Sequence, residues 1–202
     1  MKINVNLHSS IQLDNIYIDP YRISESSHDA KNILITHSHY DHLSPEDIDK
    51  IINPSTVIIA TLDAKEKLEG KYQNRIVYVK PYDNLSLGQM ELEVLPAYNT
   101  NKQFHKASSN WVGYKIIYNG NSFAILGDTD VLPEHLKLSC DHLFIPIGGV
   151  YTMNAEEAAE LTNKILPTFV TPVHYNSIVG SKADEKVFLK MLDKSITPKI
   201  YL

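Results

Sequence analysis

The sequence predicts an α/β protein in which two β-sheets lie between helices. In each half of the chain, short apolar runs typical of strands come first and helical patterns recur later. This order is typical of sheets that are covered by helices. Turn residues are spread evenly, and no linker, repeat or low-complexity tract divides the chain. We therefore expect residues 1–202 to form a single domain.

The first part of the chain begins with strands and continues into a helix. Strands are expected at residues 3–7, 11–13, 16–18 and 33–35. Ser44 can then cap the free amides of a helix, Pro45 suits its first position, and Asp47 suits the positive end of its dipole. A helix is therefore expected to begin at Pro45 and to end near Ile52.

Strands and helices alternate through the rest of the chain. Further strands are expected at residues 56–60, 75–79, 90–95, 111–118, 122–126, 142–147, 169–172 and 200–202. Further helices are expected at residues 62–68, 155–165 and 184–190. Gly70 is expected to end the first of these, and Asn154 to cap the second. Asn119 and Gly120 supply the positive φ angles of a tight hairpin turn.

Composition and charge limit the classes of partner. With 43% hydrophobic and 21% charged residues, the chain has the composition of an ordinary globular protein. Its net charge of −5 disfavours strong general binding to nucleic-acid phosphates. The N-terminal residues lack the apolar region of a signal peptide, and no apolar run approaches bilayer length. We expect a cytoplasmic protein that does not enter a membrane.

The cysteine count limits the kind of metal site. Cys140 is the only cysteine, so it can form neither an internal disulfide nor a thiolate cluster. Any metal ion must therefore be bound by nitrogen and oxygen donors.

Four candidate metal ligands occur within six positions, directly after the expected strand at residues 33–35. The chain there reads Thr36-His37-Ser38-His39-Tyr40-Asp41-His42. In an extended or turning segment His37 and His39 project to the same side, while Asp41 and His42 can turn toward a neighbouring point. Imidazole and carboxylate donors suit zinc, iron, manganese or nickel. The alternative is a solvated polar loop that is rich in histidine by accident.

This segment resembles the His-x-His-x-Asp-His signature of the metallo-β-lactamase superfamily. Two later segments extend the resemblance. Residues 127–130 (Gly-Asp-Thr-Asp) look like the family's Gly-Asp-Thr segment with Asp128, and residues 172–176 look like the segment that supplies its last histidine, here His174. Residues 146–149 and 151–158 resemble the subgroup of ascorbate-6-phosphate lactonase-like proteins. The resemblance covers nearly the whole chain.

The resemblance implies a four-layer αββα sandwich, made of two mixed β-sheets flanked by helices. It also implies two divalent metal ions, with zinc as the first choice and manganese, iron or nickel as alternatives. The implied ligands of one ion are His37, His39 and His105. Those of the other are Asp41, His42 and His174. Asp128 bridges the two ions, and Asp41 is also the implied catalytic residue, which orients the attacking hydroxide.

The third histidine of the first metal site departs from the family pattern. Tyr98 stands where several relatives carry histidine, and His105 is the only histidine between His42 and Asp128. Some members of the subgroup use a displaced histidine, so His105 is assigned as the ligand by resemblance. The alternative is a loop histidine that is exposed to solvent.

Other residues are candidates for supporting or substrate-binding roles. His8 lies in a segment that resembles the family's Gly-His-Ser-Ser, although Leu7 replaces the glycine. Asp19, at a strand end, can hydrogen-bond a ligating histidine or simply form a turn. Tyr175 and Lys182 are candidates for contact with substrate, although Lys182 equally suits a solvated loop.

The resemblance implies a metal-dependent hydrolase in which a metal-bound hydroxide cleaves an ester, lactone or phosphodiester bond. The short stretch between Asp128 and His174 leaves no room for the inserted domain of nuclease relatives, so a small or medium-sized substrate is expected. Two alternatives remain open. The same ligands bind iron, as in an iron-dependent oxidoreductase, and the fold also suits a metal-binding regulatory protein with little turnover.

Overall fold

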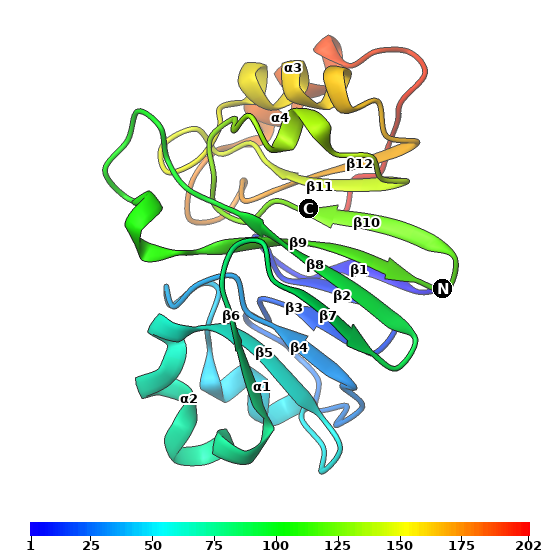
Figure 1. Cartoon of the computed structure of the whole chain (residues 1–202). Helices are drawn as coiled ribbons and strands as arrows, with labels where there is room; N and C mark the ends of the chain where they lie inside the picture. Colours follow the sequence, from blue (N-terminus) through cyan, green and yellow to red (C-terminus); the bar gives the residue numbers. More distant parts are fainter. The chain divides into compact units, whose positions relative to one another are not determined.

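The computed structural model describes the whole chain, from Met1 to Leu202. The residues fall into two compact units, the first made of Met1–Lys80 with Tyr201–Leu202 and the second of Pro81–Ile200. Each unit has its own mixed β-sheet and its own helices (Figure 1). The expected pair of mixed sheets flanked by helices is therefore confirmed. The expected single domain stays a prediction.

The sheet of the first unit has six strands in chain order. These strands are β1 (Ile3–Val5), β2 (Ile11–Leu13), β3 (Ile16–Ile18), β4 (Asn32–Leu34), β5 (Val57–Thr61) and β6 (Ile76–Val79). Strands β1 to β3 pair in antiparallel fashion, whereas β3 to β6 are parallel. Isoleucine and valine predominate in them, as expected of strands that are buried in a sheet.

Two helices cover one face of this sheet. They are α1 (Pro45–Ile51) and α2 (Lys65–Tyr72), and short 3-10 segments at Leu62–Ala64 and Gln73–Arg75 flank α2. Ile48 of α1 and Leu68 of α2 lie in a single buried core with Ile33 and Ile58 of the sheet. The last two residues are direct partners in the β4 and β5 register, so they point to the same face.

The sheet of the second unit has seven strands in the order β13-β12-β11-β10-β9-β8-β7. These are β7 (Asn84–Leu87), β8 (Met90–Pro96), β9 (Val112–Tyr118), β10 (Asn121–Ile125), β11 (His142–Pro146), β12 (Phe169–Val173) and β13 (Thr197–Pro198). Strands β7 to β10 are antiparallel neighbours, and β10 to β13 are parallel. The carboxyl ends of β10, β11 and β12 therefore lie at one edge of this sheet.

The helices of the second unit lie together beside its parallel strands. They are α3 (Ala155–Ile165) and α4 (Lys182–Met191), with short 3-10 segments at Ala107–Ser109 and His135–Lys137. Figure 1 shows α3 next to α4, and α3 also contacts β11. None of the helices of the chain combines the length and the apolar character that crossing a bilayer requires.

The local sequence signals for helix starts and for the hairpin are confirmed. Ser44 accepts a hydrogen bond from the Asp47 amide at the start of α1. Asn154 caps α3 in a capping box that Glu157 completes. Asn119 has a φ of 50° and Gly120 a φ of 73°, as the tight turn between β9 and β10 requires.

Three expectations about the elements were wrong or incomplete. Gly70 does not end a helix, because α2 continues through it to Tyr72, whose side chain is buried in the core. No strand forms at residues 200–202; the last strand is β13, which pairs with β12. The edge strand β7 was not expected, because its short segment is largely exposed and lacks an apolar run.

Candidate metal-binding residues

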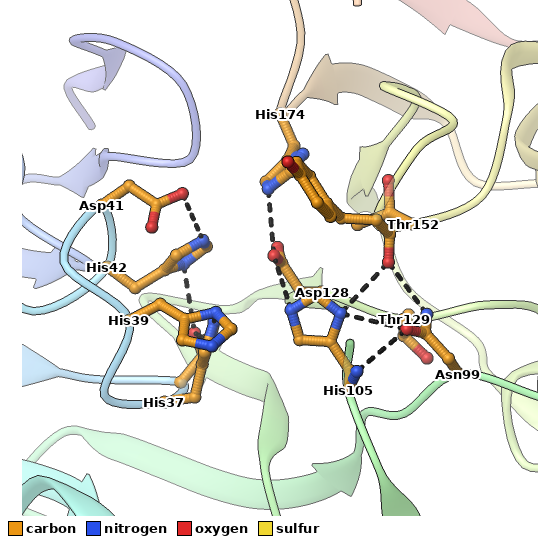
Figure 2. Close-up of polar contacts among 12 residues, drawn as sticks. His37, His39, Asp41, His42, Asn99, His105, Asp128, Thr129, Thr152 and His174 are labelled. Atoms are coloured by element: carbon orange, nitrogen blue, oxygen red, sulfur yellow. Dashed lines mark hydrogen bonds and ion pairs between the residues drawn. The ribbon is translucent and has the colours of Figure 1, made fainter. Parts of the chain in front are cut away.

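Four candidate ligands lie in the loop that follows β4, and we call them the first ligand group: His37, His39, Asp41 and His42. Three of them are buried, whereas His39 reaches the surface. Nε2 of His37 lies 3.0 Å from Nδ1 of His39. The ring centres of His37 and His42 are 4.1 Å apart, and Figure 2 shows the carboxylate of Asp41 beside His42. One loop thus brings all four side chains together, as the sequence predicts.

Thr36 and Asp19 determine where the protons of two imidazoles lie. The Thr36 hydroxyl donates to Oδ2 of Asp19 at 2.7 Å, so its oxygen is left to accept from Nδ1 of His37 at 3.0 Å. Nδ1 of His42 lies 2.7 Å from the same carboxylate oxygen, which requires an N–H there. From this network we assign both protons to Nδ1, which leaves the Nε2 lone pairs for a metal ion.

Asp19 is held firmly in an unusual backbone conformation. Its φ of 47° lies in the left-handed region, which costs a residue other than glycine about 1–2 kcal/mol. The Thr36 amide donates to its Oδ1 at 2.8 Å. Burial raises the pKa of the Asp19 carboxyl, and the facing His42 opposes that shift. Asp19 thus contacts His42, a member of the first ligand group.

His8 contacts the carboxylate of the first ligand group. Its Nε2 lies 3.1 Å from Oδ2 of Asp41, and its side chain is fully buried. Its backbone is left-handed, with a φ of 58°. The donor atoms of His8, Asp41 and His42 all lie within 4.8 Å of one another, so His8 itself is also close enough to serve as a ligand.

Three candidate ligands lie in the second unit, and we call them the second ligand group: His105, Asp128 and His174. All three are buried. Nε2 of His105 lies 3.2 Å from Oδ2 of Asp128, and Nε2 of His174 lies 3.0 Å from the same oxygen. Figure 2 shows both imidazoles pointing at this carboxylate. Asp128 follows β10 and His174 follows β12, so the parallel strands deliver both to one sheet edge.

His105 comes from a loop whose own contacts hold its ring. Nδ1 of His105 lies 3.1 Å from the carbonyl of Tyr151 and 3.2 Å from Oδ1 of Asn99. Both oxygens are acceptors, so the proton belongs on Nδ1 and the Nε2 lone pair is directed toward Asp128. His105 is therefore a buried histidine and not the solvent-exposed one of the alternative interpretation. Tyr98, at the position where several relatives carry histidine, forms hydrogen bonds between its main chain and the Thr129 hydroxyl.

Gly148, at the end of β11, makes room for His174. A Cβ at this glycine would lie 2.3 Å from the carbonyl oxygen of His174 and 3.3 Å from its Nδ1, and the first distance is impossible without a shift. His174 itself has a φ of 57°. A strained backbone at a candidate ligand is common where the surrounding structure fixes a functional side chain.

The donors in each group fit a transition-metal ion. Two donors that are each 2.0–2.2 Å from one ion lie about 3.0–3.4 Å apart at ordinary coordination angles. The separations of 3.0 Å for His37 and His39, and of 3.2 and 3.0 Å around Asp128, match this range. The donors are imidazoles and carboxylates, with protons assigned to the far nitrogens in three rings. Such sets suit zinc, manganese, iron or nickel.

The comparison with known families identifies the fold family of the chain. Residues 8–174 match the sequence profile described as Beta-lactamase superfamily domain, a range that includes both ligand groups. The chain belongs to the metallo-β-lactamase superfamily. The expected superfamily is therefore confirmed, and the lactonase-like subgroup stays a prediction.

Within the metallo-β-lactamase superfamily, the chain belongs to the UPF0173 family. It is 28% identical to a UPF0173 metal-dependent hydrolase of Pyrococcus furiosus, over 88% of this chain and 84% of the relative. A UPF0173 protein of the same organism is 31% identical, over 89% and 82%. A crystal structure from Parabacteroides distasonis, provisionally described as a metal-dependent hydrolase, is 30% identical with a TM-score of 0.81, over 98% and 91%. The expectation of a metal-dependent hydrolase is confirmed at the level of the family.

Two candidate substrate-binding residues of this superfamily member contact each other. The Tyr175 hydroxyl donates to Glu185, and its ring lies under the ammonium of Lys182, 5.8 Å from the ring centre. Lys182 forms an ion pair with Glu185 at 2.9 Å. Tyr175 is buried and Lys182 begins α4, so the contacts described for them support the structure of the second unit.

Two histidines outside both groups, His135 and His142, are buried in the core of the second unit. His142 stacks on Phe144 with ring centres 4.4 Å apart and contacts the Thr171 hydroxyl at 2.8 Å. Burial lowers the pKa of His142 and that of His135 to about 4 each. The supporting role of Asn99 was not predicted, because its contact with His105 depends on how the intervening loop folds.

Proposed function

We propose that the chain is a hydrolase whose two ligand groups together hold two divalent metal ions, with zinc as the first choice. In this proposal His37, His39 and His105 bind one ion. Asp41, His42 and His174 bind the other, and Asp128 bridges them. The observation that supports it is the assignment of protons: Asp19, Thr36 and Asn99 occupy the far nitrogens of His42, His37 and His105. The Nε2 atoms of the same three rings belong to buried side chains and lie at ligand spacing, so they are the proposed donors.

The ions would lower the pKa of a coordinated water and polarise the bond to be cleaved. The protein residues have separate tasks. Asp41 orients the attacking water, and His8, 3.1 Å from its Oδ2, holds the carboxylate in place. Asp19 supports His42 in the same way. Both supporting residues have left-handed backbones, so their positions are fixed before a substrate arrives.

The proposed substrate is a small or medium-sized organic molecule with an ester, lactone or phosphodiester bond. Exposed aromatic rings next to ligands support this size class. Tyr40, which is 62% exposed, lies between His39 and Asp41 in sequence, and Phe104, which is 50% exposed, precedes His105. Rings in such places can contact the apolar part of a substrate. The net charge of −5 favours a small molecule over nucleic acid.

Metal analysis combined with an activity panel tests the proposal. Protein expressed without metal supplementation is analysed for zinc, manganese, iron and nickel, then assayed against lactones, aryl phosphodiesters and carboxylic esters with and without chelator. We expect about two equivalents of metal at full loading and hydrolysis that the chelator abolishes. Bound iron with oxygen consumption would indicate an oxidoreductase. Bound metal without turnover on any substrate would favour a regulatory protein.

A further inference from the structure

The loop at residues 99–105 is tied to the segment that carries Asp128. Oδ1 of Asn99 accepts a hydrogen bond from the backbone amide of His105 at 3.0 Å and lies 3.2 Å from its Nδ1. The backbone amide of Asn99 in turn donates to the backbone carbonyl of His105 at 2.7 Å. One side chain and its own main chain thus hold both the backbone and the ring of the histidine. Figure 2 shows Asn99 beside the ring, on the side away from Asp128.

The other end of the Asn99 side chain is also fixed. Its Nδ2 donates to the Tyr151 carbonyl at 2.9 Å and to Oδ1 of Asp130 at 3.2 Å. The Tyr151 carbonyl is the second acceptor beside Nδ1 of His105. Asn99 therefore supplies one acceptor for the Nδ1 proton of His105, its own Oδ1, and positions the second, the Tyr151 carbonyl.

Asp130 is the centre of this network. Its buried carboxylate also accepts from the Thr100 amide at 2.8 Å and from the ammonium of Lys102 at 2.6 Å. Lys102 is largely covered, with 18% of its side chain exposed. Asp130 lies two residues after Asp128, so one short segment reaches His105 at both ring nitrogens. Asp128 meets Nε2, and Asp130 reaches Nδ1 through Asn99.

We infer that Asn99, supported by Asp130 and Lys102, is the positioning residue that makes the displaced His105 a metal ligand. This inference rests on the proposed function. A histidine on a loop with no such support would have to lose ring and backbone freedom each time it bound a metal ion. The network removes that freedom in advance and selects the tautomer with its proton on Nδ1.

Titration of metal-free protein with Co²⁺ tests the inference without any assay of activity. Wild type, His105→Ala, Asn99→Ala, Lys102→Met, Lys102→Arg and Lys106→Met are compared by the visible absorption of bound cobalt. We expect Asn99→Ala to weaken one of two cobalt sites by about 10–100-fold, the range known for lost partners of metal ligands. Lys102→Met should weaken the same site less. Lys102→Arg keeps the positive charge beside Asp130 and should bind cobalt as wild type does. Lys106 is exposed and lies outside the network, so Lys106→Met is the matched control and should bind as wild type.

The tautomer of His105 gives a second result that a merely structural role would not change. In metal-free wild type, nitrogen NMR should show the proton of His105 on Nδ1. In Asn99→Ala the share of the Nε2–H form should rise. If Asn99→Ala does not fold, Lys102→Met carries both measurements, because its site is at the rim of the network.

Three outcomes would overturn the inference. The first is unchanged cobalt affinity and tautomer in Asn99→Ala. The second is an equal loss at both cobalt sites. The third is a lower melting temperature with the tautomer unchanged, which would mean a structural role alone. Failure of the proposed function has a different signature: His105→Ala would then bind two cobalt ions as wild type does, while the tautomer of His105 would still respond to Asn99.

Discussion

The two ligand groups are built in different ways. The first takes four side chains from one loop after β4, and neighbours in that loop such as Thr36 also set its protons. The second takes its members from three segments that are far apart in sequence: the loop that ends at His105, the end of β10 and the end of β12. A short stretch of sequence specifies the first group, whereas the register of a sheet and a network of loop contacts specify the second.

This difference predicts different responses to damage. In the first group one loop carries all four side chains, so removing one of them leaves the other three on the same backbone. In the second group Asp128 is the shared contact of His105 and His174. Removing it leaves both imidazoles without the group that they face, so the second ligand group should be the more fragile of the two.

The largest expected effect is that of Asp128→Ala compared with His39→Ala. We expect Asp128→Ala to lose more than one equivalent of metal and all measurable turnover, because two histidines lose their common partner. His39→Ala removes one donor near the surface and should lose about one equivalent. Metal content by mass spectrometry and the rate on the best panel substrate measure both. Equal losses in the two variants would contradict the comparison.

A smaller effect is expected from Asp19→Asn, which changes a supporting residue of the first group. The carboxylate accepts at both oxygens, from the Thr36 amide at Oδ1 and from His42 and the Thr36 hydroxyl at Oδ2. An amide has only one acceptor oxygen and would place an N–H against one set of donors, so metal affinity should fall about 10–100-fold. Chelator competition measures the change. Asp14→Asn is the matched control, because Asp14 has a similar φ of 50°, lies in the turn between β2 and β3, and accepts a hydrogen bond from the Lys2 amide. The same loss in both variants would rule out a role for the carboxylate.

Gly148→Ala should affect the second group through packing. The added methyl group meets the His174 backbone, and overpacking of this kind costs about 1–3 kcal/mol of unfolding free energy. Displacement of His174 should weaken metal binding as well. Gly70→Ala, in α2 with open space around it, should instead stabilise the protein by about 0.5–1 kcal/mol. Denaturant unfolding with and without metal separates the loss of folding stability from the loss of metal binding. A harmless Gly148→Ala would show that the second group tolerates movement.

His142→Gln should leave metal binding unchanged and alter only the dependence of stability on pH. Burial lowers the pKa of His142 from 6.5 to about 4, so above pH 6.5 the ring is neutral in both the folded and the unfolded state. As the pH falls from 6.5 to 4, only the unfolded chain gains the proton, and up to about 3 kcal/mol of stability is lost. The variant should lose less over that interval. Unfolding curves at pH 7.5, 5.5 and 4.5 measure the slope, and parallel slopes would contradict the assignment.

The sequence predicts those parts of the fold that neighbours along the chain determine. Ser44 and Asn154 indicate where α1 and α3 begin, because a capping residue lies directly before its helix in the sequence. The end of α2 was not predictable in this way. Glycine costs a helix about 1 kcal/mol, but burial of Leu68 and Tyr72 in the core outweighs that cost. Whether those two side chains are buried depends on the sheet and not on Gly70.

The same limit applies to the candidate ligands. The first group can be read directly from Thr36 to His42. His105 could be named only through a family resemblance, and nothing in its spacing indicates that Asn99 turns back to hold it. The space that Gly148 leaves for His174 is also invisible in sequence, because it arises where β11 and β12 end side by side.

The separation of the ligand groups along the chain also sets an order in time. Ribosomes make proteins from the N-terminus, so every member of the first ligand group is synthesised before Pro81, while the second ligand group is incomplete until His174 has been added. All four candidate ligands of the first group are therefore present in the nascent chain well before the candidate ligands of the second group are complete.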